Sequence, residues 1–389
     1  MKQLLKEIAE VSAGQGAPQG DSNYCEDGIP FVKAGNLLEL TEGKSIHGIQ
    51  KVSEAVAKKY RLRLYKKGTI LFAKSGMSCL KGYVYVLPCD AYVVSHLACV
   101  TPKEDISEYL KYYFCYHRPN QLVKDEAYPS ISLSDIGCLE INTQDATYRD
   151  IVVTSLRKIS SIIEMRKQQL SELDNLVKAR FVELFGGIKN NHQRYPVVKI
   201  GSCAKLQGGF AFKSSDYLND GIRLVQISNV NKDTLDWDSI NCVPQAFLQK
   251  YKDFELHVGD LVLAMTRPVI KSLDAVKIAT VSENDVPSLL NQRVGRFVVD
   301  RKKLHSVYLM VLCQMPEFRE YVEAMSGNSL QPNISSKQVE DYSIVLPPLA
   351  LQEQFAAFIQ QTDKSKAVVQ KALDEAQTLF DSLMQQYFG

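Results

Sequence analysis

The chain has 389 residues, which is long for a single hydrophobic core and sufficient for two domains. Hydrophobic residues make up 45% of the sequence and charged residues 23%, proportions that exclude a disordered or fibrous protein. The formal net charge is only +2, so it neither supports nor excludes a polyanionic partner, whose binding depends on where the charges lie.

The sequence contains an internal repeat. Segment 177–186 ends in Phe185-Gly186, and the last segment, 380–389, ends in Phe388-Gly389, 203 positions later (389 − 186). Repetition of a whole module indicates that each copy forms one structural unit. A duplicated but non-identical module suits contact with two similar but different targets.

The globular part of each copy opens with two predicted strands. The first is a short apolar strand followed by a glycine turn, at residues 8–16 and 200–210. The second alternates apolar with polar residues after a Gly-Ile pair and reaches an Asn, at residues 28–37 and 221–230. This pattern predicts a half-buried strand that leads into a loop.

A third and a fourth pair of segments complete each copy. A glycine turn feeds a continuous apolar strand at 67–74 and 258–265, and its far end turns polar. A Pro-x-Ile-Ser segment follows late in each copy, at 128–132 and 331–335. Helical stretches such as 106–116 and 304–325 lie between them, so each copy is predicted to be mixed, strand-rich α+β. The offset between copies drifts from 193 to 191 and then to 203, which places the insertions in the globular parts.

Each copy ends in a long predicted helix with a heptad seam. From about residue 150 to 184 there is no Gly or Pro, and apolar residues recur at alternating spacings of four and three. The first seam comprises Val152, Leu156, Ile159, Ile163, Leu170, Leu173 and Val177. The second, in the same phase, comprises Phe355, Ile359, Val369, Leu373 and Phe380, with polar residues at Thr362 and Lys366 where the first has Ile159 and Ile163.

We expect the two long helices to pair with each other. About 35 residues at ~1.5 Å each make a rod on the order of 50 Å, longer than a small domain is wide. An antiparallel coiled coil would hold two modules apart at a fixed distance, related by a pseudo-twofold axis. The alternative is that each seam packs its helix only on its own domain. The predicted divisions are a first module at 1–148, a first helix at 149–190, a second module at 191–348 and a second helix at 349–389.

Nothing in the sequence predicts catalysis or a metal site. The nine cysteines form no C-x-x-C pair and lack a histidine at zinc-ligand spacing, so we expect reduced, buried thiols. Gly43-Lys44-Ser45 lacks the first glycine of a phosphate-binding loop, and Gly14-x-Gly16 lacks the third glycine of a dinucleotide fingerprint. No apolar run approaches the roughly 20 residues of a membrane helix. The start is too polar for a secretory signal, so a cytoplasmic location is expected.

These paired modules resemble the specificity subunit of a Type I restriction-modification enzyme. The resemblance rests on the Gly-Ile-x-x-Val-x-x-x-Asn strand, the Gly-x-x-Leu strand and the Gln331-Pro332-Asn333-Ile334-Ser335 segment, each set followed by a long helix. It covers essentially the whole chain, and the second copy matches better. The first copy departs from the pattern at Tyr128-Pro129-Ser130-Ile131-Ser132, which leaves its DNA contacts less defined.

The resemblance implies a recognition role without chemistry of its own. The modules would be target-recognition domains, each reading one half of a bipartite site on double-stranded DNA. The helices would set the gap between the half-sites and dock two modification (methyltransferase) subunits, which would bind S-adenosylmethionine. Restriction (translocase and nuclease) subunits would join that core. The chain itself would be non-catalytic and would hold no cofactor or metal.

Candidate DNA contacts are residues on turns or at strand ends, all but one of them polar, where base edges and phosphates could be reached. In the first copy they are Gln15, Lys33, Asn36, Lys74, Ser75 and Lys81. In the second copy they are Gln207, Phe210, Lys213, Gln226, Asn229, Thr266, Arg267, Lys271, Gln331 and Asn333. Gln331 and Asn333 could instead cap the following helix.

Aromatic residues could also stack on a distorted duplex. The candidates are Tyr24, Tyr83, Tyr85, Phe210, Phe212 and Tyr217. Core packing is expected for Tyr83 and Tyr85, whereas Phe210 and Phe212, beside Gly208-Gly209, are expected to be exposed.

Two other classes of function remain open. One is a scaffold whose modules bind protein, or a recognition subunit of another methylation-based phage-defence system. The other is a stand-alone methyltransferase or nuclease, against which the missing motifs argue. Binding to duplex DNA that weakens steeply with salt would separate a protein-binding scaffold from a DNA reader, but it would not separate the other phage-defence systems from a Type I system.

Overall fold

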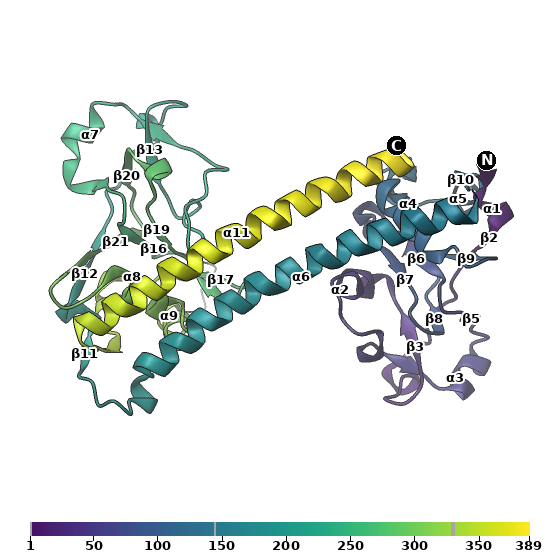
Figure 1. Ribbon diagram of the computed structural model, residues 1–389, viewed down its shortest axis with the longest axis horizontal. Coiled ribbons are helices and arrows are strands. Elements are labelled where there is room, and N and C mark those ends of the chain that lie inside the picture. Colours follow the sequence, from purple (N-terminus) through teal and green to yellow (C-terminus); the bar gives the residue numbers. More distant parts are fainter. Residues whose placement is uncertain (1, 144, 328–330) are drawn as a thin grey trace. The chain divides into compact units, whose positions relative to one another are not determined.

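The computed structural model describes residues 2–143, 145–327 and 331–389, which form two compact units. Unit 1 comprises residues 1–167 and 371–389, and unit 2 comprises residues 168–370. Two helices of 40 residues each, α6 (Ala146–Phe185) and α11 (Leu349–Phe388), contribute to both units (Figure 1). Each unit therefore contains one globular module and a part of each long helix.

Unit 1 is built on two four-stranded sheets and a two-stranded pair. The first sheet is antiparallel and has the order β2 (Ala9–Ala13), β9 (Leu97–Pro102), β6 (Ile70–Ala73) and β7 (Val84–Val86). The second has the order β4 (Lys51–Val52), β3 (Ile29–Val32), β8 (Ala91–Val93) and β5 (Leu64–Tyr65). In it β3 and β8 run parallel. The pair consists of β1 (Lys2–Leu4) and β10 (Glu140–Asn142).

Short helices complete unit 1 around these sheets. They are α1 (Leu5–Ile8), α2 (Leu37–Thr41), α3 (Glu54–Lys59), α4 (Ser107–Tyr116) and α5 (Leu133–Gly137). The core strand β6 is buried on both faces, as its uninterrupted apolar sequence predicts.

Unit 2 repeats the strand orders of unit 1. Its antiparallel sheet has the order β12 (Ala204–Gly208), β21 (Val294–Val299), β16 (Leu261–Ala264) and β19 (Ile278–Thr280). Its mixed sheet has the order β14 (Cys242–Val243), β13 (Ile222–Val225), β20 (Ser288–Leu290) and β15 (Glu255–Leu256), with β13 and β20 parallel. The pair consists of β11 (Val197–Lys199) and β22 (Ser343–Val345). The matching topologies confirm the internal repeat and the mixed α+β fold.

The insertions in unit 2 lie in its globular part, as the drifting offset predicted. One is a hairpin of β17 (Val269–Ile270) and β18 (Ala275–Val276), which follows the end of β16. The short helices are α7 (Phe247–Lys250), α8 (Ser306–Gln314), α9 (Pro316–Ser326) and α10 (Ser336–Glu340).

The helical stretch predicted at 304–325 is divided into two helices. α8 ends at Gln314 and α9 begins at Pro316. Met315 is extended, with φ −72° and ψ 148°, because a residue before proline is sterically kept out of the α region.

The repeated Phe-Gly endings anchor each long helix to a module. Phe185, at the end of α6, packs in unit 2 against Tyr308 and Phe355, with ring centroids 4.9 and 5.3 Å away. Phe388, at the end of α11, packs in unit 1 against Tyr109 at 5.3 Å, and its carbonyl is hydrogen-bonded to His117 Nε2 at 2.8 Å. Each helix therefore ends in the core of one unit.

The long helices pack together in antiparallel fashion within each unit. In unit 1, Tyr148 near the start of α6 meets Tyr387 near the end of α11, with ring centroids 6.2 Å apart. In unit 2, Phe181 near the end of α6 meets Phe355 near the start of α11, at 5.6 Å. All twelve predicted seam residues are buried or half-buried. Thr362, a polar seam residue, is buried and donates its hydroxyl hydrogen to the Phe358 carbonyl one turn earlier.

The thiols only partly match the expectation. All nine cysteines are free, and five are buried. The expectation of burial is wrong for Cys25, Cys115 and Cys138, which are exposed. Among the described residues, no helix combines the length and the apolar character needed to cross a membrane.

Candidate functional site

The predicted segments of unit 1 converge where the strands end. Because β3 and β8 are parallel, their carboxyl ends lie at the same edge of the sheet. The Val94 N–H donates to the Val32 carbonyl at 3.0 Å, which places Lys33 beside the turn that follows β8. The Ser95 N–H in that turn donates to the Gln15 carbonyl at 2.8 Å, so the first glycine turn reaches the same place.

The polar end of β6 joins this edge and pairs with the late Pro-x-Ile-Ser segment. The Lys74 N–H donates to the His96 carbonyl at 2.9 Å. The Ile131 N–H donates to the Lys74 carbonyl at 2.8 Å, and the Gly76 N–H to the Pro129 carbonyl at 3.0 Å. The third and fourth repeated segments, which are more than 50 residues apart in the sequence, thus form one antiparallel contact.

Unit 2 has the same backbone arrangement at equivalent positions. The Met265 N–H donates to the Arg293 carbonyl, and the Ile334 N–H donates to the Met265 carbonyl, both at 2.8 Å. The Arg267 N–H donates to the Pro332 carbonyl at 2.7 Å. The Gln292 N–H donates to the Phe210 carbonyl at 2.8 Å.

We call these two places the strand-end sites. Site 1 comprises Gln15, Lys33, Lys74, Ser75, His96 and Ser130. Site 2 comprises, in the same order, Phe210, Gln226, Met265, Thr266, Arg293 and Asn333. The residue type differs at all six equivalent positions, although the backbone contacts match. A common framework therefore presents two different sets of side chains.

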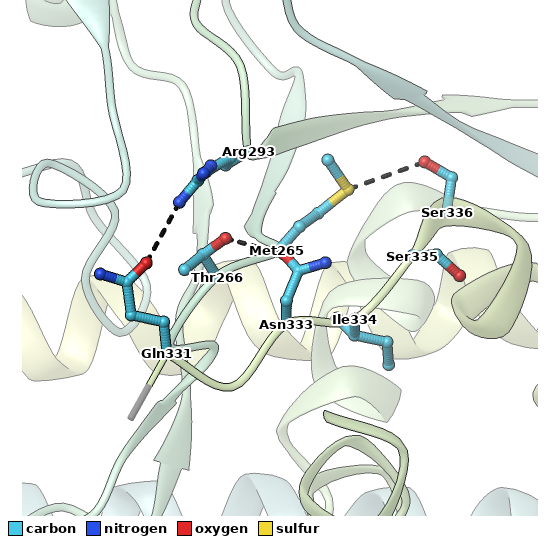
Figure 2. A pocket seen from close by; sticks show the side chains of 8 residues that line it. All are labelled: Met265, Thr266, Arg293, Gln331, Asn333, Ile334, Ser335 and Ser336. Atoms are coloured by element: carbon cyan, nitrogen blue, oxygen red, sulfur yellow. Dashed lines mark hydrogen bonds between the residues drawn. The ribbon is translucent and has the colours of Figure 1, made fainter. Parts of the chain in front are cut away.

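A pocket of about 430 Å³ opens in site 2, between the end of β16 and the 331–336 segment (Figure 2). The Thr266 hydroxyl donates to Asn333 Oδ1 at 2.7 Å, which orients the Asn333 amide. The amide nitrogen of Asn333 has no hydrogen-bond partner within the described ranges of the chain and points into the pocket in Figure 2. Arg293 Nη1 lies 3.5 Å from Gln331 Oε1 at the rim. The pocket offers amide and guanidinium donors.

Two cations, Arg267 and Lys277, lie beside site 2. Arg267 is exposed and has a left-handed φ of 48°, which turns the chain away from β16. Burial, and then the charge of Arg267, lower the pKa of Lys277, whose ammonium donates to the Ile227 carbonyl at 3.4 Å. Neither Arg267 nor Lys277 forms a salt bridge with any residue in the described part of the chain. Two close like charges left unneutralised favour an anionic ligand.

Site 1 is also polar, with different groups. Ser75 Oγ is hydrogen-bonded to His96 Nδ1 at 2.8 Å. Lys33 Nζ donates to Gln50 Oε1 at 2.6 Å and lies 4.4 Å from the centroid of the Tyr24 ring. The equivalent residue in site 2 is Gln226, whose side chain is an uncharged amide. This amide donates to the Tyr217 hydroxyl at 3.2 Å and accepts from Asn241 at 2.7 Å.

Two predicted contact residues also hold the backbone of a turn. Asn36 Oδ1 accepts the Lys33 N–H, and Asn229 Oδ1 accepts the Gln226 N–H, each at 2.9 Å. Asn229 is 1% exposed, and its amide nitrogen donates to the carbonyls of Asp236 and Ser239. The repeated Asn thus holds the turn after β3 and β13.

Gln207 lies outside site 2, inside a polar network. Its Oε1 accepts from Arg296 at 2.8 Å and its Nε2 donates to the Asp253 carbonyl at 2.9 Å. Arg296 also donates to the Glu255 carbonyl at 2.6 Å and to Asp260 at 3.2 Å. The network links the two sheets of unit 2.

The structure confirms the expected burial of some aromatic residues and contradicts the expected exposure of one. Phe212 was expected to be exposed, which is wrong, because it is 5% exposed and packs against Phe247 and Tyr251. Phe210 is half-buried, with its ring 4.5 Å from Tyr251. Tyr83 and Tyr85 pack against the core of unit 1, as expected.

The remaining predicted residues lie on loops or turns, apart from Lys81, which ends the 3₁₀ helix Met77–Lys81. Gln15 Oε1 accepts the Arg63 N–H at 3.1 Å. Lys81, Lys213 and Lys271 are exposed. Gln331 and Asn333 do not cap α10. Ser335 does, by accepting the Gln338 N–H at 3.2 Å.

The sequence alone did not single out Arg293, His96 or Lys277, which the structure places in or beside the strand-end sites. His96 follows β8 and Arg293 follows β20, and in each case a short polar stretch interrupts apolar sequence. That interruption was the available signal for a turn at a strand end. Lys277 carried no comparable signal, because its place depends on the fold.

The strand-end sites of both units are lined mainly by polar and charged side chains. No group of three or more His, Cys, Asp or Glu residues suited to a metal ion occurs within the described ranges. Burial raises the pKa of the Cys99 thiol to about 12, which leaves it protonated and weakly nucleophilic. What the sites present are cations, amides and hydroxyls.

Comparison with known proteins identifies one protein family. The family model described as "Type I restriction modification DNA specificity domain" matches residues 2–173 and 193–377. The Type I restriction enzyme MjaVIII specificity subunit of Methanocaldococcus jannaschii is 30% identical over 185 residues, covering 46% of this chain and 43% of that subunit. The MjaIX specificity subunit of the same organism is 22% identical over 410 residues, covering 98% of this chain and 90% of that subunit. The chain spans less than half of the MjaVIII subunit that it matches.

Solved structures share the fold. The S subunit of a Type I restriction-modification system from M. genitalium superposes with a TM-score of 0.58 and 13% identity, covering 100% of this chain and 96% of that one. A chain from a study of complex assembly and conformational transition of the type I R-M system gives a TM-score of 0.59 and 14% identity, covering 100% and 97%.

Proposed function

Because the chain belongs to the family of Type I restriction-modification DNA specificity domains, we propose that it reads a bipartite DNA sequence, one half-site per unit. One observation carries this proposal. Two units of identical strand order present equivalent strand-end sites in which all six side chains differ. Such a pair suits two half-sites that share duplex geometry and differ in sequence.

The residues in and around site 2 suit direct readout of base edges. Arg267 and Arg293 have the fork of donors that pairs with guanine O6 and N7. The amides of Asn333, Gln331 and Gln226 can pair with adenine, which offers both a donor and an acceptor in the major groove. Lys213, Lys271 and Lys277 suit phosphates, which would supply affinity and its salt dependence.

Site 1 would read a different half-site with a different set. Lys33 and Lys74 suit phosphates or guanine, while Ser75, His96 and Gln15 suit hydrogen bonds to base edges or phosphates. The replacement of the Lys33–Gln50 contact by Gln226–Asn241 changes a charged group into a neutral one at equivalent positions. We expect the two half-sites to differ at the base pairs that these groups face.

The helix pair would set the gap between half-sites and dock two modification subunits. Support comes from exposed apolar residues that recur at equivalent positions. Met165 and Leu176 on α6 are 53% and 49% exposed, and Val368 and Leu379 on α11, each 203 positions later, are 71% and 51% exposed. The two residues on each helix are eleven positions apart, about three turns, so they share a face. A repeated apolar stripe suits two copies of one partner.

In this assignment the chain recognises the DNA sequence and its partners carry out the reactions. The modification subunits would bind S-adenosylmethionine and methylate adenine, and restriction subunits would translocate and cut the DNA. The donors and cations of the strand-end sites fit this division, since they offer recognition groups rather than an activated nucleophile.

The test is co-expression with a modification subunit of the same restriction-modification system, followed by genome-wide mapping of methylated adenine. We expect one split motif with a constant gap. A chain in which the site 2 pair is changed (Thr266→Ala with Asn333→Ala) should relax only one half of that motif. A continuous motif, or no methylation that depends on this chain, would overturn the proposal and leave a protein-binding scaffold as the alternative.

A further inference from the structure

Two large side chains in unit 1 are exposed beside site 1. Tyr128 is 83% exposed and Met77 is 68% exposed. They flank the same backbone contact, because the Gly76 N–H donates to the Pro129 carbonyl at 3.0 Å. At the equivalent positions, site 2 has Gln331 and Pro268 in place of Tyr128 and Met77.

Both side chains project from anchored backbone. Pro129, the neighbour of Tyr128, is buried, and Asp125 Oδ1 accepts the Ala127 N–H at 2.8 Å in the preceding turn. Met77 opens the 3₁₀ helix Met77–Lys81, which is held by the buried Cys79 and its hydrogen bond to the Gly76 carbonyl at 2.9 Å. Fixed backbone lowers the entropy cost of inserting the side chains into a ligand.

The surroundings carry positive charge. The Lys74 carbonyl accepts the Ile131 N–H beside this contact, Lys81 ends the 3₁₀ helix that Met77 opens, and Arg118 lies beside Gly82, which follows that helix. None of these three cations forms a salt bridge with a described residue. Lys124 is paired with Asp135 at 2.8 Å. The three unpaired cations outnumber the two carboxylates of the loop, Asp125 and Glu126. Exposed apolar tips within a cationic border suit a ligand with anionic edges and an apolar, stackable interior, which is the construction of a DNA duplex.

We infer that Tyr128 and Met77 form a wedge that enters the base stack of the half-site read by unit 1. This inference rests on the proposed function. Apolar wedges that part a base step kink the duplex and favour flexible steps, so they select sequence through deformability. Unit 1 would then recognise its half-site partly by DNA shape, whereas unit 2, with Gln331 in the equivalent place, would rely on hydrogen bonds to base edges.

The test uses the complex assembled with modification subunits on duplexes in which 2-aminopurine is scanned through both half-sites, excluding the methylated adenine. Its fluorescence increases when a base is unstacked. We expect an increase at one step in one half-site, retained by Tyr128→Phe and abolished by Tyr128→Ala with Met77→Ala. The double variant should bind roughly tenfold more weakly, the scale of one lost base–aromatic stack. Gln331→Ala, the matched control in unit 2, should leave the signal unchanged.

A duplex with an abasic site at that step gives a second measurement, since its unstacking cost is already paid. It should restore most of the affinity of the double variant. Split-motif binding without an increase in fluorescence, or an increase that survives in the double variant, would overturn the wedge alone. Absence of sequence-specific binding by the unaltered complex would overturn the proposed function and the wedge together.

Discussion

Lys366 Nζ on α11 lies 2.5 Å from Asp174 Oδ1 on α6. Lys366 occupies a position of the helix seam, where most residues are apolar. Lys232, in the loop after β13, lies 3.7 Å from the other carboxylate oxygen of Asp174. The equivalent of Lys366 in α6 is Ile163, which is buried in unit 1. A charged pair at the seam favours one helix register, because a different register would place its charges among apolar side chains.

We predict that Asp174→Asn lowers the free energy of unfolding at pH 7 by about 0.5–1 kcal/mol, the scale of a partly exposed ion pair. Adding Lys366→Met should recover part of that loss by restoring an apolar seam. Urea unfolding measures both effects. Asp150→Asn is the control, because Asp150 is exposed on the same helix and has no salt bridge within the described ranges. Equal losses in Asp174→Asn and Asp150→Asn would contradict this role of the pair.

The same pair has a predictable dependence on pH. Burial raises the pKa of Asp174, but the hydrogen bond from Lys366 and the charges of Lys366, Lys232 and Lys178 outweigh it, and the net pKa is lowered. A carboxyl with a lower pKa in the folded state stabilises the protein above its ordinary pKa of about 4, and this contribution is lost as the pH falls through the folded value. The difference between wild type and Asp174→Asn should therefore be constant from pH 7 to 5 and shrink below pH 4. A difference that grows on acidification would contradict this assignment.

We predict that Phe388→Ala destabilises unit 1 by about 3 kcal/mol, since it removes a buried ring from a packed aromatic cluster. Leu379→Ala, on the same helix but half exposed, should change stability by less than about 0.5 kcal/mol. Thermal unfolding of the full chain compares them. Similar effects of the two substitutions would show that the end of α11 does not anchor unit 1.

We predict that Arg267→Ala weakens specific DNA binding by roughly 10- to 100-fold, the discrimination of about 1–3 kcal/mol expected from one bidentate base contact. Its melting temperature and assembly should be unchanged, because the side chain is exposed and free of salt bridges within the described ranges. Lys302→Ala is the control, because Arg293 precedes β21 and Lys302 lies beyond its opposite end, away from site 2. Gel-shift titration of the assembled complex should show weaker DNA binding for Arg267→Ala and unchanged binding for Lys302→Ala. An unchanged DNA affinity of Arg267→Ala would show that Arg267 does not contact the DNA.

We predict that Met165→Glu and Val368→Glu each weaken association with one modification subunit without lowering thermal stability, because both side chains are exposed in this chain. Ser161→Glu, an exposed polar position on α6, adds the same charge and should have no effect. Mass measurement of co-purified complexes should show one modification subunit retained in each single variant and none in the double variant. Retention of both subunits in the double variant would exclude the stripe as their docking surface.

The long helices were predictable because a heptad seam is a local pattern, and all twelve predicted seam residues are at least half-buried. The strand-end sites were only partly predictable. The segments that form them were found as repeated motifs, but the contacts of Lys74 with Ile131 and of Met265 with Ile334 join strands far apart in the sequence. No local periodicity reports such pairing.

Asn36 and Asn229 show what recurrence of a residue in both copies can indicate. Their recurrence in both copies drew attention to them as candidates, yet each accepts a backbone N–H and holds the same turn. A residue identical at equivalent positions of the two copies serves the framework that they share. The positions where the copies differ, such as His96 and Arg293, are the better candidates for readout.

Removing equivalent heptads from both helices, residues 166–172 and 369–375, measures whether the helix pair sets the gap between half-sites. Each deletion preserves the seam and shortens its helix by ~10.5 Å, about three base pairs of duplex. Mapping of methylated adenine should return the same two half-sites with a gap shorter by about three base pairs. An unchanged gap would contradict a bipartite reader whose helices fix the spacing.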